Sequence, residues 1–144
     1  MSFEQIGDVV REGNAFRLAA PGRITDEALD VEVLKALEKV KTDDGSDLLV
    51  ELIDLYLQDT PQRIMAIRSA AAEKNWVLLK RAAHTVKGSS GTLGLRQVAK
   101  VCQELEEASS PGSTEGVEVL VQLLEYKFLK ARQALAAERQ RRLQ

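Results

Sequence analysis

The sequence has very little cysteine, histidine or aromatic residue. Its 144 residues include one cysteine, Cys102, and one histidine, His84, and aromatic residues make up 4%. A single cysteine excludes a disulfide within the chain, and together the two counts exclude metal sites built from several cysteines or histidines. No apolar run approaches the roughly 20 residues that a membrane-spanning helix needs. We therefore expect no disulfide scaffold, no such metal centre and no spanning helix.

Neither sign of charge predominates, because the chain has 20 lysines and arginines and 22 acidic residues, which gives a net charge of −2. This balance does not favour binding to nucleic acid or to a membrane surface. The length, with 44% hydrophobic residues, suits one domain with a core of its own. The first residues carry acids and no long apolar stretch, so we expect no signal peptide. The sequence predicts a single-domain cytoplasmic protein that binds neither nucleic acid nor membrane.

Glycine and proline are scarce in the middle of the chain, where residues 46–87 contain Pro61 and no glycine. Apolar residues recur there, and beyond, at the spacing of a helix face. These apolar stripes run through residues 29–40, 49–71, 79–86, 95–105 and 117–135. The expected N-caps are Thr25 or Asp26, Ser46 or Asp47, Asn75, and Ser113 or Thr114. No segment alternates apolar and polar residues over enough length to predict a strand.

Short connections between long amphipathic helices favour antiparallel neighbours. We therefore predict an all-α fold, an antiparallel four-helix bundle (up-down-up-down) with the additional N-terminal helix, near residues 26–40, across one end. The stripe keeps its phase through Pro61, which predicts one long helix that the proline bends. We expect residues 1–25 to form an N-terminal extension, residues 26–138 the helical domain and residues 139–144 a basic C-terminal tail that begins as a frayed, solvated helix end.

One face of the third expected helix carries residues that could take part in a chemical reaction. On a helical wheel centred on His84, five residues lie within about 60° of it and opposite the apolar face: Lys80, Arg81, Lys87, Gly88 and Gly91. Residues 73–100 hold six basic residues against one acid, a local net charge of +5. Such cations favour the neutral imidazole, whose free nitrogen is a nucleophile, and would stabilise an attached phosphoryl group.

Spacing and charge alone leave several alternatives open. A lone exposed histidine among lysines also fits an ordinary solvated helix face, on which Gly88 could be a C-cap. His84 could instead be the general base of a hydrolase or transferase, although the sequence supplies no obvious nucleophile or orienting partner. A helical adaptor with no chemistry is the remaining class.

A longer motif distinguishes between these alternatives. The run AAHTVKGSSGTLGLRQVAKVCQELEE resembles the signature of the histidine-containing phosphotransfer (HPt) domain. That signature is a histidine, a lysine three residues later, Gly-Ser-Ser, Leu-Gly, and Cys-x-x-Leu-Glu at the end of the next helix. The matching positions here are His84, Lys87, residues 88–90, residues 93–94 and residues 102–106. The similarity extends over residues 27–138.

The resemblance implies a phosphoryl carrier, not an enzyme with kinase activity of its own. It implies that His84 accepts a phosphoryl group from the aspartate of a response-regulator receiver domain, or from a sensor or hybrid histidine kinase. A second receiver domain then takes the group from His84. Lys87 would stabilise the phosphoryl charge, and Gly88 and Gly91 would leave clearance for the partner. The receiver is expected to bring Mg²⁺, so we expect no cofactor on this chain.

Other residues are secondary candidates or structural. Lys80 and Arg81 are secondary candidates only because the helical wheel places them near His84. Some family members place a glutamine or a basic residue on the following helix near the phosphohistidine, and this chain has Gln103 and Glu106 at that turn. Glu106 would repel a phosphate, so we expect it to stay in solvent or to pair with a lysine. Cys102 lies on an apolar face, which predicts core packing.

Overall fold

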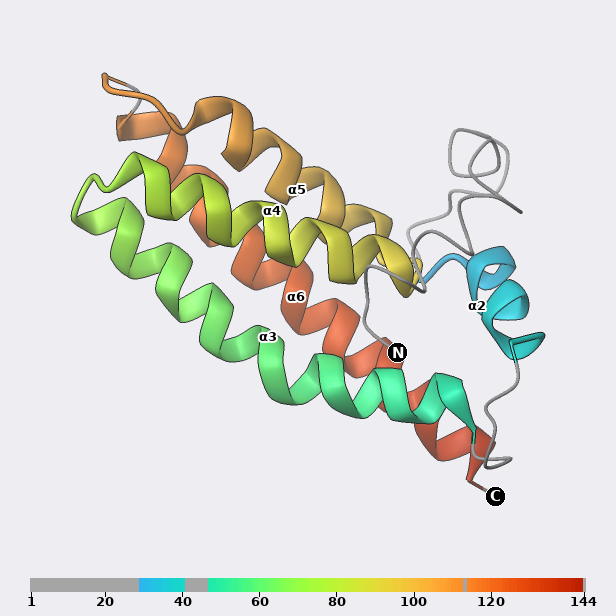
Figure 1. Ribbon diagram of the computed structural model, residues 1–144. Coiled ribbons are helices and arrows are strands. Elements are labelled where there is room, and N and C mark those ends of the chain that lie inside the picture. The colour runs from blue at the N-terminus through green and yellow to red at the C-terminus, as the bar shows by residue number, and fades with distance from the viewer. Residues whose placement is uncertain (1–28, 41–46, 113, 144) are drawn as a thin grey trace.

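The computed structural model describes residues 29–40, 47–112 and 114–143. Within these ranges all regular structure is helical: α2 (Val31–Glu38), α3 (Leu48–Ala72), α4 (Trp76–Thr92), α5 (Arg96–Ala108) and α6 (Thr114–Arg142). Helices α3 to α6 lie side by side, and α2 lies at one end of them (Figure 1). This arrangement confirms the predicted all-α fold, a four-helix bundle with an additional helix at one end.

The four long helices follow one another around the bundle. Three-residue turns, residues 73–75 and 93–95, join α3 to α4 and α4 to α5. Helix α6 packs against both α5 and α3, which closes the ring. Turns this short reverse the chain, so neighbouring helices are antiparallel, as predicted. None of the described helices is long and apolar enough to cross a membrane.

The core is built from the apolar stripes that the sequence shows. The largest fully buried side chains come from every helix and from the α4–α5 turn: Leu37, Leu49, Ile53, Tyr56, Ile67, Leu79, Leu93, Leu95, Leu105, Leu124 and Leu135. In its interior the Tyr56 hydroxyl and Ser90 Oγ are 2.8 Å apart and form a hydrogen bond, which satisfies two buried polar groups. Cys102 is buried, which raises the pKa of its thiol to about 12 and confirms its packing role.

Side-chain caps mark the starts of α2, α3 and α4. Asp47 accepts a hydrogen bond from the Val50 amide at 3.2 Å at the start of α3, and the alternative cap, Ser46, lies outside the described residues. Asn75 caps α4 in the same way, as predicted. Helix α3 continues through Pro61 as one helix. Helix α6 begins at Thr114, and Ser113 lies outside the described residues.

The start of the first described helix differs from the prediction. A helix over residues 26–40 was expected, but residues 29 and 30 are not helical and α2 begins at Val31. Its N-cap is Asp30, whose carboxylate accepts a hydrogen bond from the Glu32 amide at 3.0 Å. The expected caps, Thr25 and Asp26, lie outside the described residues and were the wrong choice for this helix.

A tertiary contact fixes Asp30 in its capping position. Its amide donates to the Gly94 carbonyl at 2.8 Å, and its carboxylate pairs with Arg96 at 2.8 Å. Gly94 has a φ of +76°, and its turn is closed by a 2.8 Å hydrogen bond from the Leu95 amide to the Ser90 carbonyl. A Cβ on Gly94 would lie 3.0 Å from the Asp30 carbonyl oxygen. Helix α2 can therefore approach the bundle this closely only because residue 94 is glycine.

The end of the long α6 helix also differs from the prediction. Residues 139–142, expected to be a frayed, solvated helix end, are the last turn of α6, but two of their arginines are held by ion pairs. Arg142 pairs with Glu38 at 2.7 Å and Asp47 at 3.1 Å, and Arg139 pairs with Asp54 at 2.5 Å. The expected solvation is correct for Gln140 and Arg141, which are exposed, and wrong for Arg139 and Arg142, because acids far away in sequence face these two arginines. The ion pairs join the end of α6 to both helices.

The turn between α3 and α4 contains a residue in an unfavourable conformation. Lys74 has a φ of +58°, which lies in the left-handed region. The residue that ends a helix in this conformation is usually glycine. We expect Lys74→Gly to raise the free energy of unfolding by about 0.5–1 kcal/mol, because glycine adopts this conformation without steric cost. Chemical denaturation measures the change. Lys74→Ala keeps the Cβ and is the control, and a gain of the same size in that variant would contradict the explanation.

Candidate functional site

His84 lies in the middle of the exposed face of α4. Its side chain is 69% exposed, whereas Ala83 and Val86 on the same helix are buried. About two helical turns precede it and about two follow it before α4 ends. The histidine is therefore presented to solvent by a rigid element, as the helical wheel predicted.

A side-chain network joins His84 to the neighbouring helix α5. The Nδ1 nitrogen of His84 lies 3.3 and 3.2 Å from the two carboxylate oxygens of Glu106. Lys87, one turn after His84, donates from Nζ to Glu106 at 2.7 Å and to the Gln103 side-chain oxygen at 2.9 Å. Four side chains from two antiparallel helices thus form one connected group, which we call the His84 network.

Glu106 is the least exposed of the three charged or titratable side chains in the His84 network. Its side chain is 13% exposed, compared with 29% for Lys87. Burial by itself would raise the pKa of Glu106, but hydrogen bonds from Lys87 and His84, together with their charges, lower it below its ordinary value. Glu106 is therefore an ionised carboxylate at neutral pH.

The other predicted site residues lie on the same face of α4. Gly88 is exposed and Gly91 is half-buried, and a Cβ at either position would meet no other heavy atom within 4 Å. The packing of the described residues therefore does not require glycine at these two positions. Lys80 and Arg81 are exposed, and within the described part of the chain neither side chain forms a hydrogen bond or an ion pair with the His84 network.

The sequence left open which residue of α5 faces His84. Glu106 does, whereas Gln103 binds Lys87 and donates from its amide to Glu107 at 2.7 Å. Of the two alternatives for Glu106, solvent or a lysine partner, the ion pair with Lys87 is the one observed. The turn position could have indicated the contact between Glu106 and His84, because His84 lies ten residues before Gly94 and Glu106 lies twelve after it. Residues at such similar distances from a tight turn lie level on antiparallel helices.

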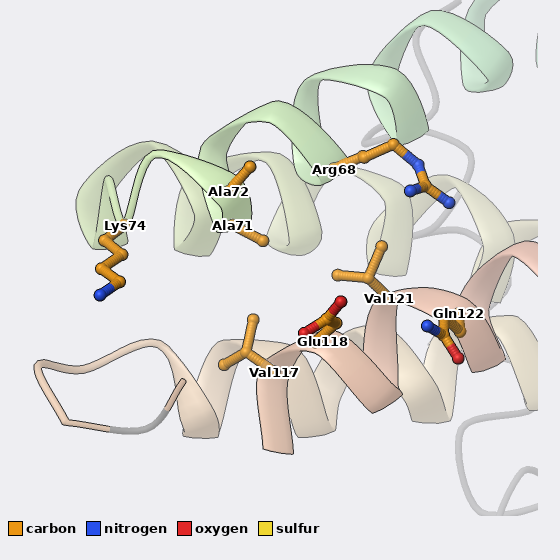
Figure 2. Close-up of a pocket in the computed structure, with 8 residues that line it drawn as sticks. All are labelled: Arg68, Ala71, Ala72, Lys74, Val117, Glu118, Val121 and Gln122. Atoms are coloured by element: carbon orange, nitrogen blue, oxygen red, sulfur yellow. The ribbon is translucent and has the colours of Figure 1, made fainter. Parts of the chain in front are cut away.

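A separate hollow lies between the end of α3 and the start of α6. Figure 2 shows that Arg68, Lys74 and Glu118 are among its lining residues. The Arg68 guanidinium is already engaged by the Glu125 carboxylate. The hollow contains no residue of the His84 network, and among all described residues no group of three or more histidine, cysteine or acidic side chains could hold a metal ion.

Comparisons with known proteins agree with the motif around His84. The family model of the Hpt domain matches residues 51–141. Multistep phosphorelay regulator 1 of Schizosaccharomyces pombe is 28% identical over 91 residues, which are 63% of this chain and 31% of that protein. The chain therefore spans about a third of the length of that relative.

A solved structure shows the same fold. The crystal structure of histidine-containing phosphotransfer protein B (HptB) from Pseudomonas aeruginosa PAO1 matches with a TM-score of 0.72 at 29% sequence identity. The match covers 81% of this chain and 98% of the bacterial chain. The likeness therefore extends over almost the whole of that protein.

Proposed function

The chain belongs to the Hpt domain family, and on that premise we propose that it is a phosphorelay intermediate. His84 accepts a phosphoryl group from a phospho-aspartyl receiver domain, or from a kinase, and passes it to another receiver domain. The observation that carries this proposal is the position of His84. It is the only histidine of the chain, it occupies the histidine position of the family motif, and it is 69% exposed in the middle of α4.

Nε2 of His84 is the nitrogen that forms the bond to phosphorus. Nδ1 faces Glu106, so Nε2, on the other side of the ring, is the nitrogen open to a partner. As Nε2 bonds to phosphorus, the P–O bond to the receiver aspartate breaks and its electron pair stays on the aspartate oxygen. Transfer to the next receiver reverses these steps. Such a reaction depends mainly on positioning and on charge stabilisation.

Lys87 stabilises the charge of the phosphoryl group. Its ammonium group is one turn from His84, and its flexible stem allows it to reach a group on Nε2. In the structure described here it is held by Glu106 and Gln103. Lys80 and Arg81, on the same exposed face, would attract the acidic site of a receiver. We assign them a secondary role in docking.

The protein acts as a carrier without kinase activity of its own. We propose that the receiver domains supply Mg²⁺ and the acidic pocket, and that a sensor or hybrid histidine kinase supplies the phosphoryl group upstream. Support comes from the family, whose members are phosphotransfer carriers. Incubation with each phosphorylated receiver domain of the source organism tests the assignment. Labelling by at least one receiver is expected, and failure of every receiver and kinase to label the protein would favour an adaptor role.

Substitutions of Gly88 distinguish between two interpretations of this face of α4, a docking surface and an ordinary helix surface. Because a Cβ there meets nothing, Gly88→Ala should raise the free energy of unfolding by up to about 1 kcal/mol. A long side chain one turn from His84 should obstruct a receiver, so Gly88→Gln should slow transfer from a receiver tenfold or more, about 1.4 kcal/mol in barrier. A small donor such as phosphoramidate should be affected far less. Stopped-flow or gel-based transfer rates and denaturation curves measure both effects.

Gly116 supplies the matched control for this prediction. It is an exposed glycine of α6 with equally open space around it, and it lies on a helix that does not carry the His84 network. Gly116→Gln should leave transfer from a receiver unchanged. Equal rates for Gly88→Gln and the wild type would refute the clearance role. A loss of stability in Gly88→Ala would show that the glycine serves the backbone instead.

A further inference from the structure

A groove between α2 and α6 lies apart from the His84 network. Its volume is about 1140 Å³, which exceeds the roughly 300–1,000 Å³ of typical small-molecule sites. Its apolar lining comes from the segment around α2 and from α6: Leu29, Val31, Leu34, Tyr126, Ala134 and Ala137. Val31 and Tyr126 remain 50% and 54% exposed. An exposed apolar surface with charged residues at its border is typical of a site where another protein docks.

The acidic side chains that line the groove already have arginine partners. Glu38 of α2 pairs with Arg142 at 2.7 Å, and Glu138 of α6 pairs with Arg141. These pairs neutralise the negative charge of the lining. An approaching carboxylate therefore meets little repulsion from the acids of the groove.

The lysines that line the groove have no acidic partner among the described residues. They are Lys35 of α2 and Lys127 and Lys130 of α6. The ammonium groups of Lys127 and Lys130 lie 6.0 and 5.7 Å from the centre of the Tyr126 ring. An exposed aromatic side chain thus lies beside two positive charges, which combines an apolar contact with sites for carboxylates.

We propose that this groove is a docking site for an acidic amphipathic helix of a partner protein. Both walls are helices, whose backbone groups are hydrogen-bonded within each helix, so they offer no strand edge to which an extended peptide could add. The occupant must satisfy its own backbone, as a helix does, and bind through its side chains. Its apolar face contacts the lining of the groove, and its carboxylates pair with the three lysines.

Docking in the groove leaves the exposed face of His84 free. Helix α4 packs against α3 and α5, and α6 packs against the same two helices. Helices α4 and α6 are therefore diagonal in the bundle, and no residue of the His84 network lines the groove. A partner held in the groove stays bound while another protein contacts His84. The proposal does not depend on phosphotransfer by His84.

A synthetic helical peptide tests the proposal. Leucines at positions i, i+3, i+4 and i+7 form one face of the peptide, and glutamates occupy the others. NMR of the ¹⁵N-labelled full chain shows where the peptide binds, and fluorescence anisotropy gives its affinity. We expect saturable binding, with shifts confined to the residues around the groove, that weakens as salt screens the charges. A peptide with lysines in place of the glutamates should bind about tenfold more weakly or worse.

Two neighbouring alanines of α6 give a matched pair of variants. Both are exposed, but Ala137 lines the groove and Ala136 does not. Ala137→Glu adds bulk and negative charge to the groove and should weaken binding of the acidic peptide about tenfold, whereas Ala136→Glu should leave it unchanged. Lys130→Gln should also weaken binding. Its control is Arg132→Gln, which loses the same charge at an exposed position of α6 outside the groove.

Several results would overturn the proposal. Absence of saturable binding would do so, as would equal binding of the lysine peptide or equal affinities of Ala137→Glu and Ala136→Glu. A dimer in sedimentation that Ala137→Glu dissociates would assign the groove to a second copy of the chain. Stronger peptide binding by Ile6→Asp would assign it to the chain's own N-terminal segment. None of these measurements needs a receiver or a phosphoryl group, so their outcome is separate from that of the proposed function.

Discussion

Replacing His84 by glutamine is expected to abolish labelling by a phosphorylated receiver and to leave the fold intact. Glutamine has a similar polarity but no nitrogen lone pair that can bond to phosphorus. The histidine side chain is 69% exposed and its partner in the structure is Glu106, so removal should change the free energy of unfolding by less than about 1 kcal/mol. Phosphotransfer assays, far-UV circular dichroism and the melting temperature measure these quantities.

Two outcomes of the His84→Gln experiment would contradict the site assignment. Retained labelling would mean that another residue accepts the phosphoryl group. Loss of the helical signal would mean that the histidine is a structural residue. Thr85→Gln is a useful control, because Thr85 is the next residue of α4 and its hydroxyl bonds only to the Arg81 carbonyl among the described residues. That variant should still be labelled.

Gly94→Ala is expected to lower the free energy of unfolding by about 2 kcal/mol or more. Part of the loss comes from the φ of +76°, which costs an alanine about 1–2 kcal/mol. The rest comes from the added Cβ, which would lie 3.0 Å from the Asp30 carbonyl oxygen and 3.1 Å from the Val33 Cβ. Because Val33 belongs to the buried core, α2 must move to make room. Urea denaturation measures the loss.

A substitution at Gly112 distinguishes between the two causes of that loss, the left-handed backbone conformation and the close contact of the added Cβ. Its φ is +95°, but a Cβ there would meet nothing within 4 Å. Gly112→Ala should therefore lose the conformational part alone, about 1–2 kcal/mol. Equal losses in the two variants would show that the close approach of α2 to Gly94 costs nothing on substitution. No loss in Gly94→Ala would show that residue 94 is not held in the left-handed conformation.

The long helices could be predicted because each carries a continuous apolar stripe. In α5, Val98, Cys102 and Leu105 recur at helical spacing, and all three are buried in the structure. Periodicity of this kind depends only on neighbours within one helix. The start of α2 could not be predicted in the same way. Asp30 caps it while bonded to the Gly94 carbonyl, and no local pattern reveals a partner that far along the chain.

In the candidate site, too, contacts within one helix could be predicted from the sequence and contacts between helices could not. His84, Lys87 and Gly88 share one helix, so a helical wheel places them together. Glu106 belongs to another helix, and its contact with His84 depends on how α4 and α5 are aligned across the turn at Gly94. The sequence indicated the charge of Glu106 but not which nitrogen it would face. The basic end of α6 was misjudged for a similar reason, because the acids that bind it come from α2 and α3.

In the relay proposed here, His84 carries a phosphoryl group from one partner to the next. A two-step transfer experiment tests it most directly: the protein is labelled by a phosphorylated receiver, purified, and then mixed with each second receiver of the source organism. We expect an acid-labile, base-stable label that peptide mapping places on His84 and that leaves the protein when the cognate second receiver is added. A label on any other residue, or a label on His84 that no receiver removes, would contradict it.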